Sequence, residues 1–105
     1  MLYIREIYEK TGWEEAVSYP QGTKIKTLRD EDGAKTVLLK FPKGFHIEEH
    51  AHIYNEQHLV LEGEYESEGK VYSAGTYRLI HAKKNHGPFT SKEGAIVLVI
   101  WDSIK

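Results

Sequence analysis

The sequence has 105 residues and a formal net charge of −2, from 14 lysines and arginines against 16 aspartates and glutamates. This size predicts one domain with a modest core, and the charge balance argues against binding to nucleic acid or to an acidic membrane surface. Cysteine is absent, so any bound metal must be held by nitrogen and oxygen.

The N-terminal residues 1–19 fit either a helix or a strand, and we expect an N-terminal arm or edge segment there. Their first ten residues carry charges and no long apolar run, which predicts neither a signal peptide nor a membrane span. A cytoplasmic location is therefore expected. Strands are predicted at residues 24–29 and 35–41, and the acidic residues 30–33 between them predict a solvated hairpin tip rather than a cation site.

Short strands and turns then recur as far as the end of the chain. Further strands are predicted at residues 46–53, 57–62, 65–68, 70–73 and 76–80, with Gly63 closing the second of them. The last predicted strand, residues 95–101, reads AIVLVIW and is apolar at nearly every position. It is expected to be buried on both faces, or buried on one face and covered by a partner chain on the other. This pattern predicts an all-β sandwich or barrel formed by residues 24–101.

A candidate metal site lies between the strands of this central region. His50 and His52 are two residues apart, and Glu56 follows four residues later. Residues at i and i+2 of a strand point to one face, so a strand through both histidines would aim the two imidazoles the same way. The next strand can fold back and bring the carboxylate beside them. Such a group binds a divalent transition metal (Fe, Mn, Ni, Cu or Zn), and His86 is the candidate fourth ligand.

The same residues fit a known motif. The spacing Gly44-x5-His50-x-His52-x3-Glu56-x6-Gly63 resembles the first cupin motif at every specified position. The resemblance implies an all-β single domain with the cupin double-stranded β-helix, a jelly-roll barrel, and a metal at its centre.

The second cupin motif is met only in part. Gly75 and His86 have the required spacing, whereas His81, Lys83 and Thr90 stand where the motif has proline, glycine and asparagine. These departures bear on the turn before His86 and do not touch a predicted ligand.

A narrower resemblance covers the later strands. The stretches LVLEGEYESEGKVYSAGTYRL and HGPFTSKEGAIVLVI resemble the ChrR-type cupins. That group includes the sensor half of a zinc-containing anti-sigma factor and relatives that resemble acetylacetone-cleaving and hydroxyacetophenone dioxygenases. The resemblance implies a homodimer as the usual assembly. The sequence carries no helical sigma-binding segment before the cupin motif, so we expect no direct anti-sigma role.

His58 is a candidate catalytic residue. It shares the strand parity of Glu56, so both side chains are expected to point into the barrel. There the imidazole could be a base, a hydrogen-bond donor to a substrate or an extra ligand, or it could simply fill the cavity wall. Glu56 is either a direct ligand or a partner that orients a histidine.

Other polar and aromatic residues have more ordinary expected places. His46 is expected to be exposed or at the rim, His81 to lie in a loop, and Glu48 to be solvated. The core and cavity wall are expected to contain Tyr65, Tyr72, Tyr77 and Phe89.

The sequence therefore favours a single cupin domain over residues 1–105 that binds a metal and a small-molecule ligand or substrate. The leading hypothesis is an oxygenase that acts on a diketone or hydroxy-ketone. One alternative is a non-catalytic sensor or binding module in which zinc rigidifies the barrel. Another is a non-redox isomerase that uses His58 as its base. The fold cannot separate these functions, and the sequence discloses neither the substrate nor the physiological metal. A homodimer is expected because residues 95–101 carry apolar side chains of both parities.

Overall fold

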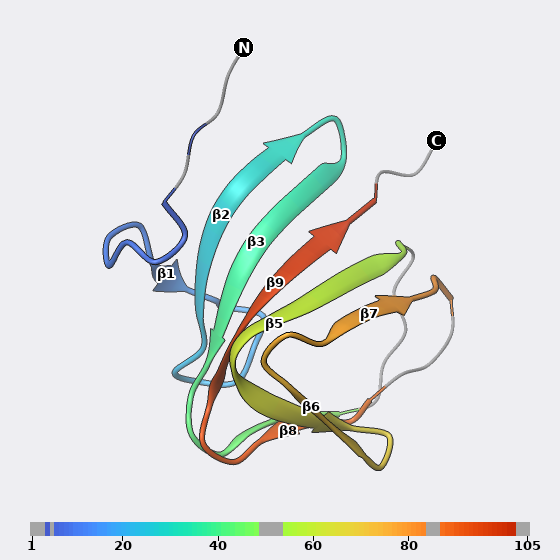
Figure 1. Ribbon diagram of the computed structural model, residues 1–105. Helices are drawn as coiled ribbons and strands as arrows, with labels where there is room; N and C mark the ends of the chain where they lie inside the picture. The colour runs from blue at the N-terminus through green and yellow to red at the C-terminus, as the bar shows by residue number, and fades with distance from the viewer. Residues whose placement is uncertain (1–3, 5, 49–53, 84–86, 103–105) are drawn as a thin grey trace.

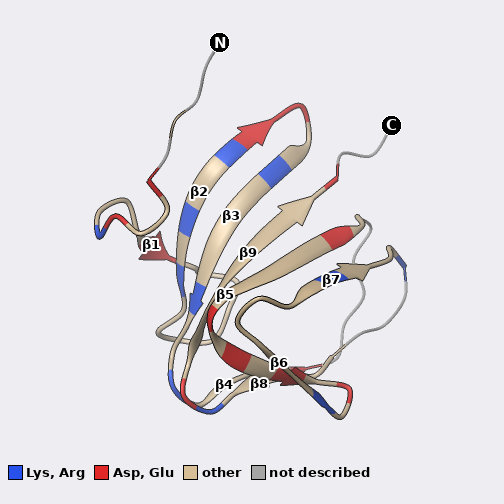
Figure 2. Cartoon of the chain, viewed as in Figure 1, with Lys and Arg blue, Asp and Glu red and all other residues tan. Residues whose placement is uncertain are grey.

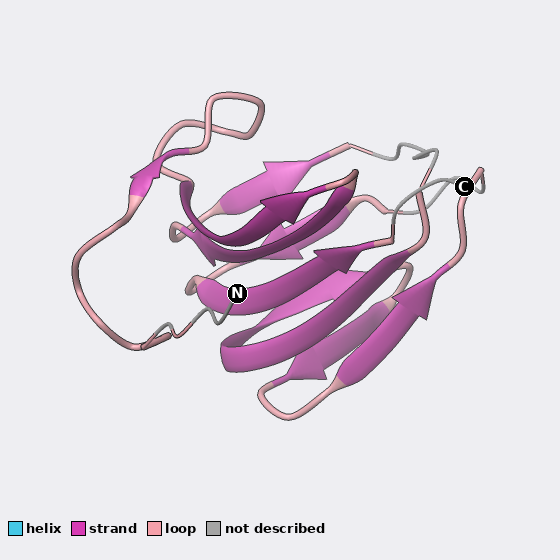
Figure 3. Cartoon of the chain, turned by 90° about the horizontal axis from the view of Figure 1, so that it is seen from above, coloured by secondary structure: helices cyan, strands magenta, loops and turns pink. Residues whose placement is uncertain are grey.

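The computed structural model describes residues 4, 6–48, 54–83 and 87–102 (Figure 1). Within these ranges the chain consists of strands and their connecting loops (Figure 3), so the prediction of an all-β domain is confirmed. The strands are β1 Glu14–Glu15, β2 Lys24–Glu31, β3 Ala34–Phe41, β4 Phe45–Ile47, β5 Glu56–Ser67, β6 Lys70–Ser73, β7 Tyr77–Ile80, β8 Phe89–Ser91 and β9 Ala95–Trp101.

The strands form one curled antiparallel sheet with the order β1-β2-β3-β9-β5-β8-β4, to which β6 and β7 are added by pairing with β5. In Figure 1, β2, β3, β9 and the first part of β5 make the long curved layer, and β6 and β8 lie beneath it. Strand β5 belongs to both layers, because its residues 56–63 pair with β9 while its residues 64–67 pair with β6. The result is a half-barrel whose inner face holds the core.

A sharp bend in β5 carries the chain from one layer to the other. The pairing with β9 shifts register between Val60 and Glu62, which marks a β-bulge. Gly63 follows with a φ of 73°, and a Cβ there would lie 2.3 Å from the carbonyl oxygen of Gly94. Only glycine fits this close approach of two backbones. The prediction that Gly63 ends a strand is therefore wrong, and the two strands predicted at 57–62 and 65–68 are one.

The β2–β3 hairpin confirms the predicted acidic tip, although the turn itself is shorter than the predicted residues 30–33. Asp32 and Gly33 form the turn with φ angles of 52° and 81°, while Asp30 and Glu31 still pair with β3. Two successive positive φ angles suit the right-handed twist of the flanking strands. Figure 2 shows basic residues along β2 and β3, and acidic residues at the end of β2 and along β5, so charge is unevenly distributed along the strands.

The remaining boundaries differ more from expectation. The strand predicted at residues 46–53 ends at Ile47 in β4, and its residues 49–53 lie outside the described part of the chain. Strand β8 has no counterpart among the predicted strands. The N-terminal residues contribute a short edge strand, β1, that pairs with β2. Lys26 of β2 donates to the backbone carbonyl of Glu9 and lies 5.0 Å from the centroid of the Trp13 ring, so this segment covers part of the outer face.

The core lies between the two layers. Its buried side chains are Val37, Leu39, Phe41, Phe45, Val60, Tyr65, Ile80, Phe89, Ala95, Val97 and Val99. Along β9, alternate residues are buried while Ile96, Leu98 and Ile100 are half-buried on the outer face. The strand is thus buried on one face only.

One aromatic residue departs from its expected place. Tyr77 is 57% exposed, because along β7 the buried Ile80 and the half-buried Arg78 take the inward positions of the alternation. The prediction that Tyr77 lines the core is wrong. No helix in the described ranges is long and apolar enough to cross a membrane.

Candidate metal centre

A cavity of about 30 Å³ lies against the inner face of the sheet. Its walls are formed by Tyr19, Leu39, Phe41, Phe45, Ile47, Glu56, His58, Phe89 and Val99. Glu56 and His58 bring a carboxylate and an imidazole to this otherwise mainly apolar wall. They are two residues apart on β5 and only 4% and 7% exposed, which confirms the expectation that they share the inner face.

A chain of hydrogen bonds runs from Glu56 through His58 to two residues farther along the sequence. The Nε2 atom of His58 is 3.1 Å from Oε1 of Glu56, and its Nδ1 atom is 2.8 Å from the hydroxyl of Tyr65. Arg78 donates through Nη1 to the same hydroxyl at 3.2 Å. Both ring nitrogens of the buried imidazole therefore have partners.

The donors and acceptors of these hydrogen bonds are fixed when the imidazole is neutral and the carboxylate is ionised. A carboxylate only accepts and a guanidinium only donates. His58 must then carry its hydrogen on Nε2 and donate it to Glu56, while Tyr65 donates to Nδ1 and accepts from Arg78. Burial raises the pKa of Tyr65 above its ordinary 10.0, and the hydrogen bond and charge of Arg78 offset only part of that rise. The phenol thus keeps the proton that this arrangement requires.

Aromatic rings hold the guanidinium at the far end of the chain. The Cζ atom of Arg78 lies 4.2 Å from the ring centroid of Tyr72, and the centroids of Tyr65 and Phe89 are 5.9 and 6.0 Å away. Cation–π contacts of this kind restrain the position of the charged group. Arg78 is also the direct β-sheet partner of His58 across the β5–β7 pairing.

Three of the four predicted ligands, His50, His52 and His86, lie outside the described residues, so their role as ligands stays a prediction. Among the residues that are described, no group of three or more His, Asp or Glu side chains gathers in a metal-binding arrangement. Glu56 is the predicted ligand that the structure describes. Its buried carboxylate is hydrogen-bonded to an imidazole, and its role as a ligand likewise stays a prediction.

Residues near the described ends of the neighbouring segments line the same cavity as Glu56 or pair with it. The chain enters the segment with His50 and His52 one residue after Ile47, which lines the same cavity as Glu56. The segment with His86 follows Ile80, the β-sheet partner of Glu56, and ends before Phe89 on the cavity wall. The connectivity is therefore compatible with the predicted ligand set.

The other predicted polar residues lie away from the cavity. His46 is exposed, as expected, with Nδ1 3.0 Å from the Thr90 hydroxyl and Nε2 in contact with the exposed Glu48. His81 is exposed in the loop after β7. These residues do not line the cavity that contains Glu56.

Sequence reasoning misses two residues of this site. Tyr19 lies in a stretch whose sequence indicates only a turn, yet it lines the cavity, and its pKa is raised to about 12 by burial and by the negative charge of Glu56. Arg78 falls within the ChrR-like stretch but at no specified position of either cupin motif. Inward alternation along β7 with Ile80 could have pointed to Arg78, whereas nothing local to Tyr19 indicates that its loop folds over the cavity.

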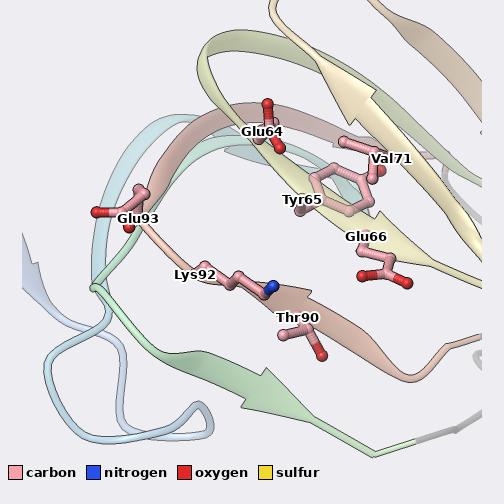
Figure 4. Close-up of a pocket in the computed structure, with 7 residues that line it drawn as sticks. All are labelled: Glu64, Tyr65, Glu66, Val71, Thr90, Lys92 and Glu93. Carbon is pink, nitrogen blue, oxygen red and sulfur yellow. The ribbon is translucent and has the colours of Figure 1, made fainter.

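A second cavity, of about 180 Å³, lies around the turn that joins β8 to β9 and the adjoining parts of β5 and β6 (Figure 4). Its walls are Glu64, Tyr65, Glu66, Val71, Thr90, Lys92 and Glu93, and it shares none of them with the cavity at Glu56. Figure 4 shows the charged groups of this hollow spread around its edge, without an imidazole. It is not part of the candidate metal centre.

Comparison with known proteins supplies a family match and several similar folds. The family model described as the ChrR cupin-like domain matches residues 5–104. A comparison with curated proteins finds no match. A chain from the complex of Rhodobacter sphaeroides SigE with the anti-sigma ChrR is 25% identical, with a TM-score of 0.75 over 90% of this chain and 51% of that one. The present chain thus spans about half the length of that relative.

Two further solved structures extend the comparison. An RmlC-like cupin from Shewanella frigidimarina is 25% identical, with a TM-score of 0.77 over 93% of this chain and 88% of that one. An acetylacetone dioxygenase from Acinetobacter johnsonii has a TM-score of 0.81 over 96% of this chain and 73% of its own, at 14% identity. At that identity the likeness concerns the fold alone.

Proposed function

This chain belongs to the ChrR cupin-like domain family, and we propose that it binds a divalent transition metal and oxygenates a small diketone or hydroxy-ketone. The proposed ligands are His50, His52, Glu56 and His86. The observation that carries the proposal is the buried pair of Glu56 and His58 on the wall of a mainly apolar cavity inside a cupin fold. The substrate class is taken from one structural neighbour, an acetylacetone dioxygenase, whose likeness to this chain concerns the fold alone.

When bound, such an ion supplies Lewis acidity toward the oxygens of a chelating substrate and, if it is iron, the one-electron chemistry that O₂ requires. The protein's own residues hold the geometry. His58 donates to Oε1 of Glu56 and thereby fixes the carboxylate, while Leu39, Phe89 and Val99 keep the surroundings apolar and exclude water.

His58 serves in this proposal as a positioning residue. Both of its nitrogens are engaged, with Glu56 and with Tyr65, so accepting a proton from a substrate would require one of these bonds to break. Its predicted role as a catalytic residue stays a prediction.

The second candidate function is a non-catalytic metal-dependent sensor or binding module. The likeness to a chain of the SigE complex with the anti-sigma ChrR supports it, at 25% identity over half of that chain. In this function zinc would occupy the same ligands and rigidify the domain without turnover.

Elemental analysis of protein purified without added metal tests the proposal. About one divalent transition-metal ion per chain is expected, and His50→Ala or His86→Ala should remove it, because each variant loses a proposed ligand. Binding requires neutral imidazoles, so occupancy should also decline as the pH falls below the ordinary imidazole pKa of about 6.5. His46→Ala is the matched control, since that histidine is exposed and pairs with Glu48.

The outcomes separate the two functions. A protein that is metal-free and also refuses added Fe(II), Mn(II), Ni(II) and Zn(II) would contradict both. Iron-loaded protein should take up O₂ with acetylacetone or with a hydroxyacetophenone. Stable metal binding without any turnover would favour the sensor.

A further inference from the structure

Tyr19 lies in the loop between β1 and β2, outside the strands that enclose the core. The loop is closed by its own backbone: Tyr19 N donates to the Ala16 carbonyl at 3.0 Å, Ala16 N to the Thr23 carbonyl at 3.0 Å, and Thr23 N to the Pro20 carbonyl at 3.1 Å. Ala16 and Thr23 are both buried. The loop is therefore anchored on both sides of the tyrosine, and the position of the ring is set by these anchors.

The Tyr19 side chain borders two hollows. The inner one is the cavity of about 30 Å³ that Glu56 and His58 line. The outer one has a volume of about 330 Å³ and opens at the surface, where Lys35 and Trp101 also line it. Among the described residues, Tyr19 alone lines both hollows, and its ring is therefore the candidate partition between them.

The two hollows differ in what they can hold. A cavity of about 30 Å³ accommodates one or two water molecules, whereas pockets for organic ligands typically occupy about 300–1,000 Å³. The outer hollow reaches that range. About half of its wall is apolar, from Ala16, Val17, Ile25 and Trp101, and the rest includes Glu15, Ser18 and Lys35. An organic ligand can therefore place its bulk in the outer hollow, and from there the Tyr19 ring lies between it and Glu56.

We propose that Tyr19 determines the size of the ligand that reaches the Glu56 side of the cavity. This inference rests on the proposed function and narrows its substrate class to diketones or hydroxy-ketones small enough to pass the Tyr19 ring. The aromatic substituent of a bulkier ligand keeps that ligand in the outer hollow, against Trp101. Lys35, whose Nζ is 6.0 Å from the Trp101 ring centroid, borders that substituent with a positive charge.

The test compares two ligands of different size on nickel-loaded protein, because Ni(II) allows binding to be measured without turnover. Calorimetry gives the dissociation constants of acetylacetone and of benzoylacetone, which carries a phenyl group. Tyr19→Ala should improve the affinity for benzoylacetone relative to acetylacetone by about tenfold or more, since a pocket contact of this size is worth that factor. Tyr19→Phe should leave the ratio unchanged because it keeps the ring.

Tyr8→Ala is the matched control, since Tyr8 is an exposed tyrosine of the same N-terminal segment. Its affinity ratio should equal that of the unaltered protein. If Tyr19→Ala does not fold, Tyr19→Leu replaces it with the same expected direction. An affinity ratio that is the same in the unaltered protein and in the folded Tyr19 variant would overturn the inference.

A second readout does not depend on the metal. If the chain takes up neither nickel nor Fe(II), Mn(II) or Zn(II), the proposed function fails, and benzoylacetone is added to the metal-free proteins instead. In Tyr19→Ala it should shift the amide resonances of Leu39 and Val99, which line the inner cavity, and in the unaltered protein it should leave them in place. The same response in both proteins would show that Tyr19 is not the partition.

Discussion

Replacing Tyr65 with phenylalanine isolates the hydrogen-bond chain behind Glu56, because it removes one hydroxyl and keeps the buried ring. That hydroxyl lies 2.8 Å from Nδ1 of His58 and accepts from Arg78 at 3.2 Å. Tyr65→Phe therefore breaks two hydrogen bonds at once. The half-buried Arg78 can turn toward water, whereas Nδ1 of His58 is left inside the core without a donor.

The size of the effect follows from this difference. A lost buried hydrogen bond and the unsatisfied imidazole nitrogen together should lower the free energy of unfolding by about 2 kcal/mol. In a domain of this size that corresponds to a decrease of roughly 10 °C in the midpoint of thermal unfolding. The matched control is Tyr72→Phe, since the Tyr72 ring stacks on the same guanidinium but its hydroxyl takes no part in the chain.

Urea and thermal unfolding measure the stability of both variants, and ¹H–¹⁵N spectra of the imidazole report which nitrogen of His58 carries hydrogen. The unaltered protein should show the Nε2–H form. In Tyr65→Phe, the Nδ1 signal should lose its hydrogen-bond shift. A Tyr65→Phe variant as stable as Tyr72→Phe, or an unaltered protein with the hydrogen on Nδ1 of His58, would contradict the hydrogen-bond chain described above.

Three further predictions concern other parts of the molecule. Light scattering should give twice the mass of one chain, because Leu98, Leu59 and the exposed Tyr77 are neighbours in an apolar patch on the outer face of the sheet. Leu98→Glu should give a monomer, and a monomeric unaltered protein would exclude the dimer. Gly63→Ala should lower the free energy of unfolding by about 2–4 kcal/mol in urea titrations, and by clearly more than Gly69→Ala, where φ is 81° but no atom lies within 4 Å of an added Cβ. The pKa of Tyr19 is about 12 in the folded protein, against the ordinary 10.0 of a tyrosine in the unfolded chain, so folding favours the neutral phenol. This stabilisation is complete below pH 10 and is lost as the pH rises toward 12. The free energy of unfolding measured over this range should therefore decrease by on the order of 2 kcal/mol, and Tyr19→Phe should lack this decrease.

Much of the fold could be predicted because periodicity and turn chemistry are local properties. The acidic hairpin tip, the apolar last strand and the shared face of Glu56 and His58 each follow from a few neighbouring residues. Gly63 shows where this approach stops. A glycine after an apolar run usually ends a strand, but here it is required by the carbonyl oxygen of Gly94, which is distant in the sequence.

The site was harder to predict because its members meet through tertiary structure. Tyr19 comes from a loop whose own sequence indicates only a turn, and no periodic pattern connects it to Glu56. In the sequence, Arg78 has no feature of its own that distinguishes it from other charged residues of short strands, because its role depends on the aromatic rings that pack around it. Propensity describes a residue's own backbone, whereas these roles depend on what packs against the side chain.

The bend in β5 explains how one strand supplies both ends of a hydrogen bond inside the site. His58 and Tyr65 are seven residues apart, and in a straight strand they would lie about 23 Å from each other and on opposite faces. The bulge between Val60 and Glu62 adds one residue, which restores the inward face to Tyr65. The turn of the strand at Gly63 then returns its hydroxyl to 2.8 Å from His58. Gly63, the last residue of the first cupin motif, is thus needed to build the site whose ligands the same motif predicts.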